Sequence, residues 1–325
     1  MNQPLTIPPG TKMTISAEDT QSAGQHYAFV MNASSLVGTD SFTLAPGHEL
    51  RRASTTEIST IKEVIIKSLM HGPTMMPWEQ RTVEGGSLES MPEAEWRYFV
   101  ISFQGSNHVL LDIEEAFSVA RAELKIGFTV LKSPGRSGLM FDPGRLFHLL
   151  EQAKWGHLGF IDVTASDVEQ IVQIHTQLEK YDRRLVDVKR FTRQLQDLEA
   201  LPPSSPLRFL GYFAVLEALL THLPNPTDPY ESITRQIKKK VSLLDHRWQS
   251  PIEYSSFAGE KSEKIWKKMY DYRSVLAHGG APAFDDELQI LKNHDNALKL
   301  LKQTVKAVIR QALVEPQLLA DLRDC

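Results

Sequence analysis

Short apolar runs and amphipathic segments alternate through the first 180 residues, and this pattern predicts a mixture of strands and helices. Aromatic and branched residues bounded by polar or glycine-containing turns indicate three short strands, at residues 27–31, 97–103 and 126–131. Residues 71–92 are rich in Gly, Pro and Met and are expected to form a long loop. The pattern therefore predicts an α+β domain, to which we assign residues 1–180.

Two helices of this domain have recognisable starting residues. Ser54 and Glu57 have the spacing of a capping box, in which each side chain accepts a hydrogen bond from the other residue's backbone N–H. An apolar face with helical spacing follows, formed by Ile58, Ile61, Ile65 and Leu69. Asp112 is expected to open a second helix that ends at Leu124.

From Ser166 onward the apolar positions recur at intervals of three and four residues, which predicts helices throughout. Ser166 and Glu169 match a second capping box at the start of the first of these helices. The expected helices cover residues 166–178, 185–198, 207–220, 230–244, 260–278 and 286–314. We predict an all-α helical bundle for residues 181–325, with the domain boundary near Lys180 or, alternatively, near the proline-rich break at Pro202.

Length and composition limit the classes of protein. A chain of 325 residues, 42% of them hydrophobic, suggests two domains with packed cores. Its apolar runs are far shorter than the roughly 20 residues that span a bilayer, and its N-terminal residues lack the pattern of a signal peptide, so we expect a cytoplasmic protein without membrane association. The single cysteine, Cys325, leaves no intrachain disulfide and no cysteine metal cluster. No HExxH sequence, Asp-rich loop, P-loop or Rossmann fingerprint occurs, so metal-dependent hydrolysis and nucleotide use have no support.

The net charge of −4 is unevenly distributed, because residues 1–200 carry 19 basic and 25 acidic groups and residues 201–325 carry 17 and 15. The C-terminal part is therefore the better place for an anionic partner. Basic residues gather in two patches there: Arg235, Lys238, Lys239 and Lys240 form one, and Lys264, Lys267 and Lys268 form the other. Each patch is either a nucleic-acid contact or a solvated helix face. A third group, His48, Arg51 and Arg52, either binds an anion or belongs to an ordinary loop before the capped helix.

The sequence YDYRSVLAHGG, residues 270–280, closes the helix that is expected over residues 260–278. Arg273 lies at the edge of the apolar face of this helix, and His278 lies at its C-terminal end, just before the stop signal Gly279-Gly280. Arginine stays charged and can grip a phosphate, and histidine can transfer protons near neutral pH, so the pair is suited to phosphodiester chemistry. Alternatively, His278 only caps the helix beside a surface arginine.

Glu217 is an unusual residue in its predicted helix, LRFLGYFAVLEALL, which is apolar nearly all round and is therefore expected at the centre of the bundle. A buried carboxylate must be paired or neutral, and Arg273 is its natural partner. The pair either fixes the register of two helices or orients the arginine for function.

Three blocks, RFLGYFAVLEALL, ITRQIKKKVSLL and YDYRSVLAHGG, occur in this order, and through them residues 180–325 resemble the HEPN superfamily, in particular the C-terminal domain of ApeA-type bacterial defence proteins. The resemblance implies a bundle of four or more helices that commonly forms two-fold dimers. Many members are metal-independent endoribonucleases, and others are inactive binding or dimerisation modules. The invariant arginine and histidine of the family, with four residues between them, correspond to Arg273 and His278, and its acidic residue corresponds to Glu217. Tyr270 and Ser274 are supporting positions, where Ser274 replaces the commoner Asn, Asp or His.

This resemblance implies an enzyme that cleaves single-stranded RNA, in which the ribose 2′-hydroxyl of the RNA attacks the neighbouring phosphate. The reaction is expected to need neither a metal ion nor another cofactor. The residues expected to bind RNA are Arg235, Lys238, Lys239, Lys267 and Lys268. The expected protein is a toxin or anti-phage defence effector that acts as a homodimer and is restrained by its N-terminal domain until a phage or host trigger releases it. Gly280 stands where toxins controlled by a nucleotidyltransferase often carry tyrosine, which argues against that form of control. The alternative is a non-catalytic HEPN module that dimerises or binds nucleic acid.

Overall fold

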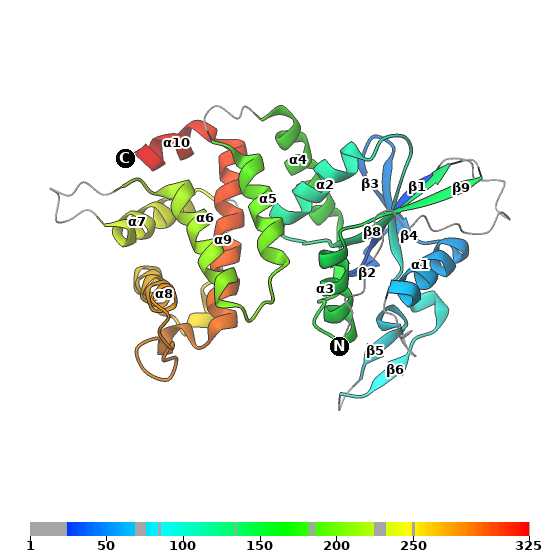
Figure 1. The fold of residues 1–325 in the computed structure, drawn as a ribbon. Coiled ribbons are helices and arrows are strands. Elements are labelled where there is room, and N and C mark those ends of the chain that lie inside the picture. The colour runs from blue at the N-terminus through cyan, green and yellow to red at the C-terminus, as the bar shows by residue number, and fades with distance from the viewer. Residues whose placement is uncertain are drawn as a thin grey trace, which may run out of the picture. The chain divides into compact units, whose positions relative to one another are not determined.

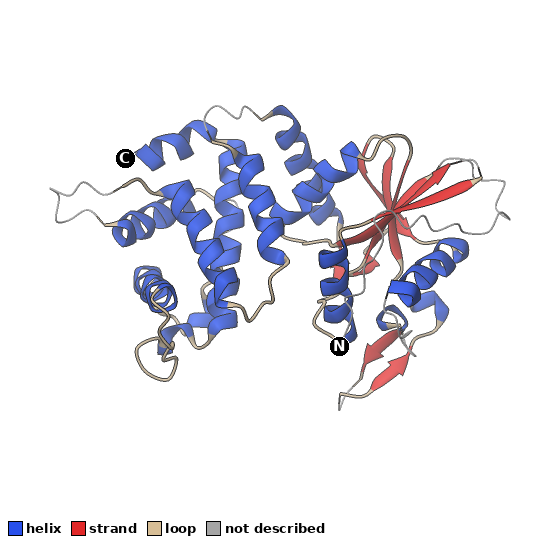
Figure 2. Cartoon of the chain, in the orientation of Figure 1, coloured by secondary structure: helices blue, strands red, loops and turns tan. Residues whose placement is uncertain are grey.

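The computed structural model describes residues 25–68, 76–83, 86–133, 135–181, 186–223, 232–248 and 251–324, which form two compact units (Figures 1 and 2). The first unit comprises the described residues up to Glu114 together with Leu124–Glu169, and the second comprises Glu115–Glu123 together with the described residues from Gln170 onward. The strands of the described residues all belong to the first unit, and the second unit is helical. The segment Glu115–Glu123 thus belongs to the helical unit, although it lies in the range that the sequence assigns to the first domain.

A six-stranded antiparallel sheet with the strand order β3-β4-β7-β1-β8-β9 forms the centre of the first unit. Its strands are β1 (His26–Val30), β3 (Ser41–Ala45), β4 (His48–Arg52), β7 (Phe99–Phe103), β8 (Ile126–Ser133) and β9 (Arg136–Met140). The central strands β1, β7 and β8 are the three that the sequence predicts, and most of their side chains are buried, which explains their continuous apolar runs. The edge strands β3 and β9, and β4 next to β3, are more exposed and more polar, so their sequences lack this signal.

Two short ladders accompany the main sheet. Strand β2 (Ala33–Leu36) pairs in parallel with β10 (Ile161–Val163), and β5 (Gln80–Thr82) pairs in antiparallel orientation with β6 (Leu88–Ser90).

The expectation of a long loop over residues 71–92 was therefore wrong for its described part, which contains β5, β6 and a 3-10 turn (Pro77–Glu79). Residues 71–75, 84 and 85 lie outside the described residues. Strand β6 is exposed along its whole length and so has no apolar pattern that could signal a strand. Trp78 anchors the segment, because it is fully buried and its indole N–H donates to the Met31 carbonyl at 2.6 Å.

Helix α1 (Thr55–Ser68) begins at the predicted capping box. A Glu57 carboxylate oxygen accepts the Ser54 backbone N–H at 2.8 Å, and the Ser54 hydroxyl accepts the Glu57 backbone N–H at 3.3 Å. The predicted apolar face of α1 packs into the core of the first unit through Ile58, Ile61 and Ile65, whereas Leu69 lies outside the described residues. Helix α3 (Pro143–Lys154), which the sequence did not predict, packs into the same core.

Helix α2 (His108–Val119) starts before Asp112 and ends before Leu124, so both predicted boundaries were wrong. Its first turn is already formed at Asn107, whose carbonyl accepts the backbone N–H of Leu111 at 3.1 Å.

The basic group ahead of α1 lies in strand β4 rather than in a loop. His48 is buried and stacks on the Phe103 ring at a centroid distance of 5.3 Å. Arg51 donates two hydrogen bonds, of 2.8 and 2.9 Å, to the Glu57 carboxylate. Arg52 donates to the Trp96 carbonyl at 3.0 Å. All three side chains are engaged within the fold, and nothing in their geometry supports an anion site.

The helical unit is organised around α6, which packs against α5, α7, α8, α9 and α10 (Figure 1). The helices are α4 (Ala165–Lys180), whose first turn belongs to the first unit, α5 (Val188–Glu199), α6 (Pro206–Leu220), α7 (Ile233–Asp245), α8 (Ser262–Ala277), α9 (His294–Val314) and α10 (Pro316–Asp324). The central position of α6 is the one expected from its nearly uniform apolar sequence. Among the described residues, no helix combines the length and the apolar character that crossing a membrane requires.

Three of the helix boundaries that differ from those predicted have a clear physical cause. The capping box of α4 is formed by Thr164 and Asp167, whose reciprocal bonds of 3.0 and 3.2 Å replace those expected from Ser166 and Glu169. Helix α9 begins only after Asn293, whose side chain caps it by accepting the Asn296 backbone N–H at 2.9 Å. The α-helix that was predicted from residue 286 therefore does not include residues 286–293. Helix α10 follows α9 after a break at Glu315, where Pro316 opens it.

Candidate functional site

Helix α8 carries the arginine and histidine that the sequence singles out. Its buried face is formed by Ile265, Trp266, Met269 and Tyr272. Arg273 follows directly after Tyr272, and 32% of its side chain remains exposed. The arginine therefore lies where the buried face of the helix meets the surface, as its position in the apolar pattern predicts.

Arg273 and Glu217 form the ion pair that the sequence predicts. The Arg273 Nη2 atom lies 3.4 Å from Glu217 Oε2, so that α8 is joined to the central helix α6. The Arg273 guanidinium also lies 5.9 Å from the centre of the Tyr270 ring, which in turn packs edge-on against Phe213 of α6. The pair holds the arginine at one nitrogen, and the remaining guanidinium N–H groups make no hydrogen bond within the described part of the chain. These groups can face an incoming anion.

His278 is the C-cap residue of α8, with φ −95° and ψ 7°. The helix ends in a Schellman motif, in which the Gly280 N–H donates to the Val275 carbonyl at 2.8 Å and the Gly279 N–H donates to the Leu276 carbonyl at 3.1 Å. Gly279 has a φ of +71°, a conformation that glycine adopts without strain. The predicted stop signal is thus confirmed. The His278 side chain is exposed and makes no hydrogen bond or ion pair to the described residues, so both of its ring nitrogens remain available.

Ser274 lies between the arginine and the histidine and is half-buried. Its backbone carbonyl accepts the His278 N–H at 3.1 Å, which ties the C-cap residue to the last turn of α8. No side-chain hydrogen bond joins Ser274 to Arg273 or His278. Of the two supporting positions, Tyr270 packs its ring against the Arg273 guanidinium, and Ser274 holds His278 through its backbone carbonyl.

A second histidine, His294, lies beside α8, and no sequence pattern signals it. The Tyr272 hydroxyl donates to His294 Nδ1 at 2.6 Å, and His294 Nε2 donates to the Pro203 carbonyl at 2.8 Å. Because a carbonyl oxygen can only accept, the proton of the neutral ring belongs on Nε2. His294 therefore holds together the start of α9, the middle of α8 and the turn before α6.

The two basic patches lie on neighbouring helices, α7 and α8. Arg235, Lys239 and Lys267 are exposed, and Lys238 and Lys268 are half-buried. Lys240 does not belong to the exposed patch, because only 7% of it is accessible and its amine donates to Gln236 Oε1 at 3.4 Å. Asp271 lies 3.2 Å from the Lys268 amine and partly neutralises the second patch. Among the described residues, no hydrogen bond or ion pair joins either patch to Arg273 or His278.

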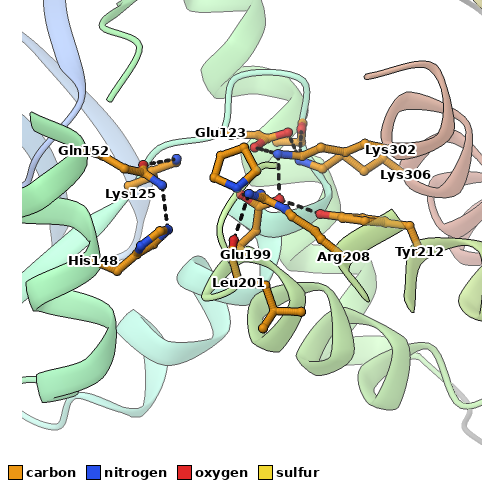
Figure 3. A network of polar contacts seen from close by, with 12 residues as sticks. Glu123, Lys125, His148, Gln152, Glu199, Leu201, Arg208, Tyr212, Lys302 and Lys306 are labelled. Carbon is orange, nitrogen blue, oxygen red and sulfur yellow. Dashed lines mark hydrogen bonds and ion pairs between the residues drawn. The ribbon is translucent and has the colours of Figure 1, made fainter. Parts of the chain in front are cut away.

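A network of charges that the sequence did not reveal lies deeper in the helical unit (Figure 3). Its members are Glu123, Glu199, Arg208, Tyr212, Lys302 and Lys306, which we call the buried charge network. The Lys302 amine lies 2.5 Å from one Glu123 oxygen and 2.7 Å from a Glu199 oxygen, and the Lys306 amine lies 2.5 Å from the other Glu123 oxygen. The network links α9 to α5 and to the segment Glu115–Glu123 that the helical unit takes from the first half of the chain.

Glu199 is the centre of this network. It also lies 2.5 Å from the Arg208 guanidinium and accepts the Tyr212 hydroxyl at 2.5 Å. Burial alone would raise the pKa of Glu199, but the charges of Lys302 and Arg208 outweigh burial and hold the pKa well below its usual range. The carboxylate therefore stays charged at neutral pH, and its role is to tie three helices together.

The described residues contain no group of three or more His, Cys, Asp or Glu side chains arranged to hold a metal ion. Comparison of the chain with models of known protein families, with curated proteins and with solved structures found no match. The interpretation of the Arg273 and His278 region therefore depends on its own geometry and on the sequence resemblance described above.

Proposed function

We propose that the chain is a metal-independent HEPN-type endoribonuclease in which Arg273 and His278 act on the scissile phosphate. One observation supports this proposal above the others. An arginine anchored to a carboxylate of the central helix α6 and a histidine with an unengaged side chain lie within the last turns of a single helix. This is the arrangement that the HEPN resemblance implies.

In the proposed reaction, one imidazole removes the proton of a ribose 2′-hydroxyl, and the 2′-oxygen forms a bond to phosphorus as the bond from phosphorus to the 5′-oxygen breaks. A second imidazole protonates the departing 5′-oxygen. Arg273 stabilises the negative charge that develops on the non-bridging oxygens. The products are a 2′,3′-cyclic phosphate and a 5′-hydroxyl. Two histidines are needed for this division of roles, and we propose that a homodimer supplies His278 from each copy.

The exposed basic residues of α7 and α8 would guide the RNA backbone. Arg235, Lys238, Lys239 and Lys267 would contribute a salt-dependent attraction without sequence preference, while Lys268 would contribute less because of Asp271. Specificity for single strands would then come from the need for a flexible 2′-hydroxyl geometry at the scissile phosphate.

Such an enzyme endangers the cell that makes it, and we propose that the first unit restrains it until a phage or host trigger acts. Deletion of residues 1–180 is not a clean test of this idea, because it removes Glu123. The amines of Lys302 and Lys306 would lose this carboxylate, and the helical unit would be destabilised. Restraint is better tested on the full chain, by comparing RNA integrity in cells with and without phage infection.

A non-catalytic binding or dimerisation module is the second candidate function. One observation favours this candidate: Arg273 and His278 both have structural roles that need no catalysis. Arg273 joins α8 to α6 through Glu217, and His278 forms the C-cap of α8.

Induced expression of three chains distinguishes these functions: wild type, His278→Ala and His246→Ala. His246 is a matched control, because it is also an exposed C-cap histidine, at the end of α7. A nuclease restrained by the first unit predicts slow growth and fragmented RNA after phage infection for wild type and His246→Ala, and intact RNA under the same conditions for His278→Ala. Equal behaviour of all three chains, with intact RNA before and after phage infection, would favour the binding module.

A further inference from the structure

A pocket of about 280 Å³ lies in the helical unit, and neither Arg273 nor His278 lines it. It is lined by residues of α4 and α9, by residues just beyond the C-terminal ends of α7 and α9, and by Arg121 of the segment Glu115–Glu123. Its volume is close to the lower end of the range in which proteins bind small molecules. None of its lining residues belongs to the buried charge network or to the proposed ribonuclease site.

The charge of the pocket is positive. Its lining includes Arg121, Arg247 and Arg310 and one acidic residue, Glu315, which gives a formal charge of +2. Glu315 is already engaged, because it lies 2.9 Å from the Arg247 guanidinium and accepts a hydrogen bond of 2.6 Å from the Gln311 amide. Arg121 and Arg310 therefore supply the uncompensated charge.

Arg310 is the more informative of these two arginines. It is half-buried, and its one hydrogen bond within the described residues is to the backbone carbonyl of Val119, at 2.7 Å. Burial, and then the repulsion of Arg121, lower the pKa of Arg310 to about 10. A negatively charged ligand that contacts both guanidinium groups would offset their repulsion and stabilise the charged form of Arg310.

The rest of the lining can recognise a polar molecule. The side-chain amides of Gln173 and Gln177 line the pocket and make no hydrogen bond to the described residues. Trp248 also lines the pocket, although only 9% of it is exposed, and its buried indole N–H has no hydrogen-bond partner among the described residues. Amides that can donate and accept are suited to hydroxyl groups and to the edges of nucleobases.

We propose that this pocket binds a small phosphorylated molecule, whose phosphate contacts Arg121 and Arg310 and whose polar remainder contacts Gln173 and Gln177. A phosphate monoester carries close to two negative charges at neutral pH and so matches the lining better than a single carboxylate does. The planar guanidinium group also suits the geometry of phosphate oxygens. This site is independent of the proposed ribonuclease activity, and its test needs no RNA cleavage.

Isothermal titration calorimetry on the full chain tests the proposal with millimolar inorganic phosphate, ribose 5-phosphate and AMP, and with ribose and adenosine as uncharged counterparts. We expect the phosphate esters to bind, inorganic phosphate to bind more weakly, and ribose and adenosine not to bind. Arg310→Gln and Arg121→Gln should each weaken binding about tenfold or more, since each removes hydrogen bonds to a charged group. Lys299→Gln is the matched control, because it removes a positive charge from an exposed position of the same helix, α9, and should leave binding unchanged.

Arg121 is exposed, so Arg121→Gln keeps the test valid even if Arg310→Gln disturbs folding. Absence of heat with every phosphorylated probe would overturn the proposal, as would binding that neither arginine substitution weakens. Equal affinity for inorganic phosphate and for both esters would overturn the role of the two glutamines.

Discussion

The ion pair between Arg273 and Glu217 leads to a specific prediction about stability. Removal of one partner from a fully buried ion pair costs about 3 to 5 kcal/mol, whereas an exposed pair contributes about 0 to 1 kcal/mol. The side chain of Arg273 is 32% exposed, that of Glu217 is 17% exposed, and a single contact of 3.4 Å joins them. The pair thus lies nearer to the exposed limit, and we expect Arg273→Ala to lower the free energy of unfolding by about 1 to 2 kcal/mol, including the lost packing on Tyr270.

Urea unfolding followed by far-ultraviolet circular dichroism measures this change. A double-mutant cycle with Glu217→Gln isolates the interaction itself, and we expect a coupling free energy of about 0.5 to 1 kcal/mol. A loss of about 3 kcal/mol or more in Arg273→Ala, with a coupling free energy of similar size, would contradict this prediction, because it would mean that water does not weaken the ion pair. If the predicted small loss is observed, the same variant can be used to test function, since it remains folded.

Three further predictions concern the stability of the helical unit. Glu199→Gln should lower the free energy of unfolding by about 2 to 3 kcal/mol in urea titrations, because Glu199 has short contacts with Arg208 and Lys302 and the Arg208 side chain, only 5% exposed, would lose its carboxylate. Asp197→Asn at an exposed position of the same helix should change the free energy little, and equal effects of the two substitutions would show that the network adds no stability. The pKa of Glu199 is lower in the folded chain than the value of about 4.3 in the unfolded chain, so the stability that its ion pairs contribute is present above that pH and is lost as the pH falls further. The urea midpoint of wild type should therefore fall more below pH 4 than that of Glu199→Gln. Parallel pH curves for the two chains would rule this out. Gly279→Ala should lower the free energy of unfolding by about 1 to 2 kcal/mol in thermal melts, because the φ of Gly279 is +71°, whereas an added Cβ would meet no atom within 4 Å. Gly144→Ala, at a position without positive φ, should lower it less. An unchanged stability of Gly279→Ala would show that the end of the helix can rearrange.

The parts of the fold that the sequence predicts are those with strong local patterns. Strands β1, β7 and β8 are buried and apolar, and α1 begins at the capping box of Ser54 and Glu57. Helix α6 is central because its sequence is apolar nearly all round. Strand β6 is exposed and polar, and its pairing with β5 leaves no trace in the sequence pattern.

Local patterns also have more than one solution. Thr164 with Asp167 and Ser166 with Glu169 both resemble capping boxes, and the structure uses the first of them, directly after strand β10. In the same way, an apolar pattern continues through residues 286–314, but the helix starts only where the Asn293 side chain caps it. Periodicity finds a helix more reliably than it finds the first residue of that helix.

The candidate site was only partly accessible to sequence reasoning. The partnership of Arg273 with Glu217 follows from a carboxylate in an apolar helix, and the end of α8 follows from two glycines. The buried charge network depends instead on contacts such as that between Lys302 and Glu123, which lie 179 positions apart in the chain. Such a contact exists only once the segment Glu115–Glu123 has joined the helical unit, and no local pattern signals it.

The most direct test of the proposed ribonuclease is an analysis of the RNA ends produced by the chain purified from cells before and after phage infection, with a single-stranded RNA and with the same strand carrying 2′-deoxyribose throughout. For the chain from infected cells we expect fragments that end in a 2′,3′-cyclic phosphate and begin with a 5′-hydroxyl, formed by wild type and His246→Ala but not by His278→Ala or Arg273→Ala, and no cleavage of the deoxyribose strand. Cleavage of both strands, or cleavage of RNA that persists without His278, would contradict the proposed mechanism.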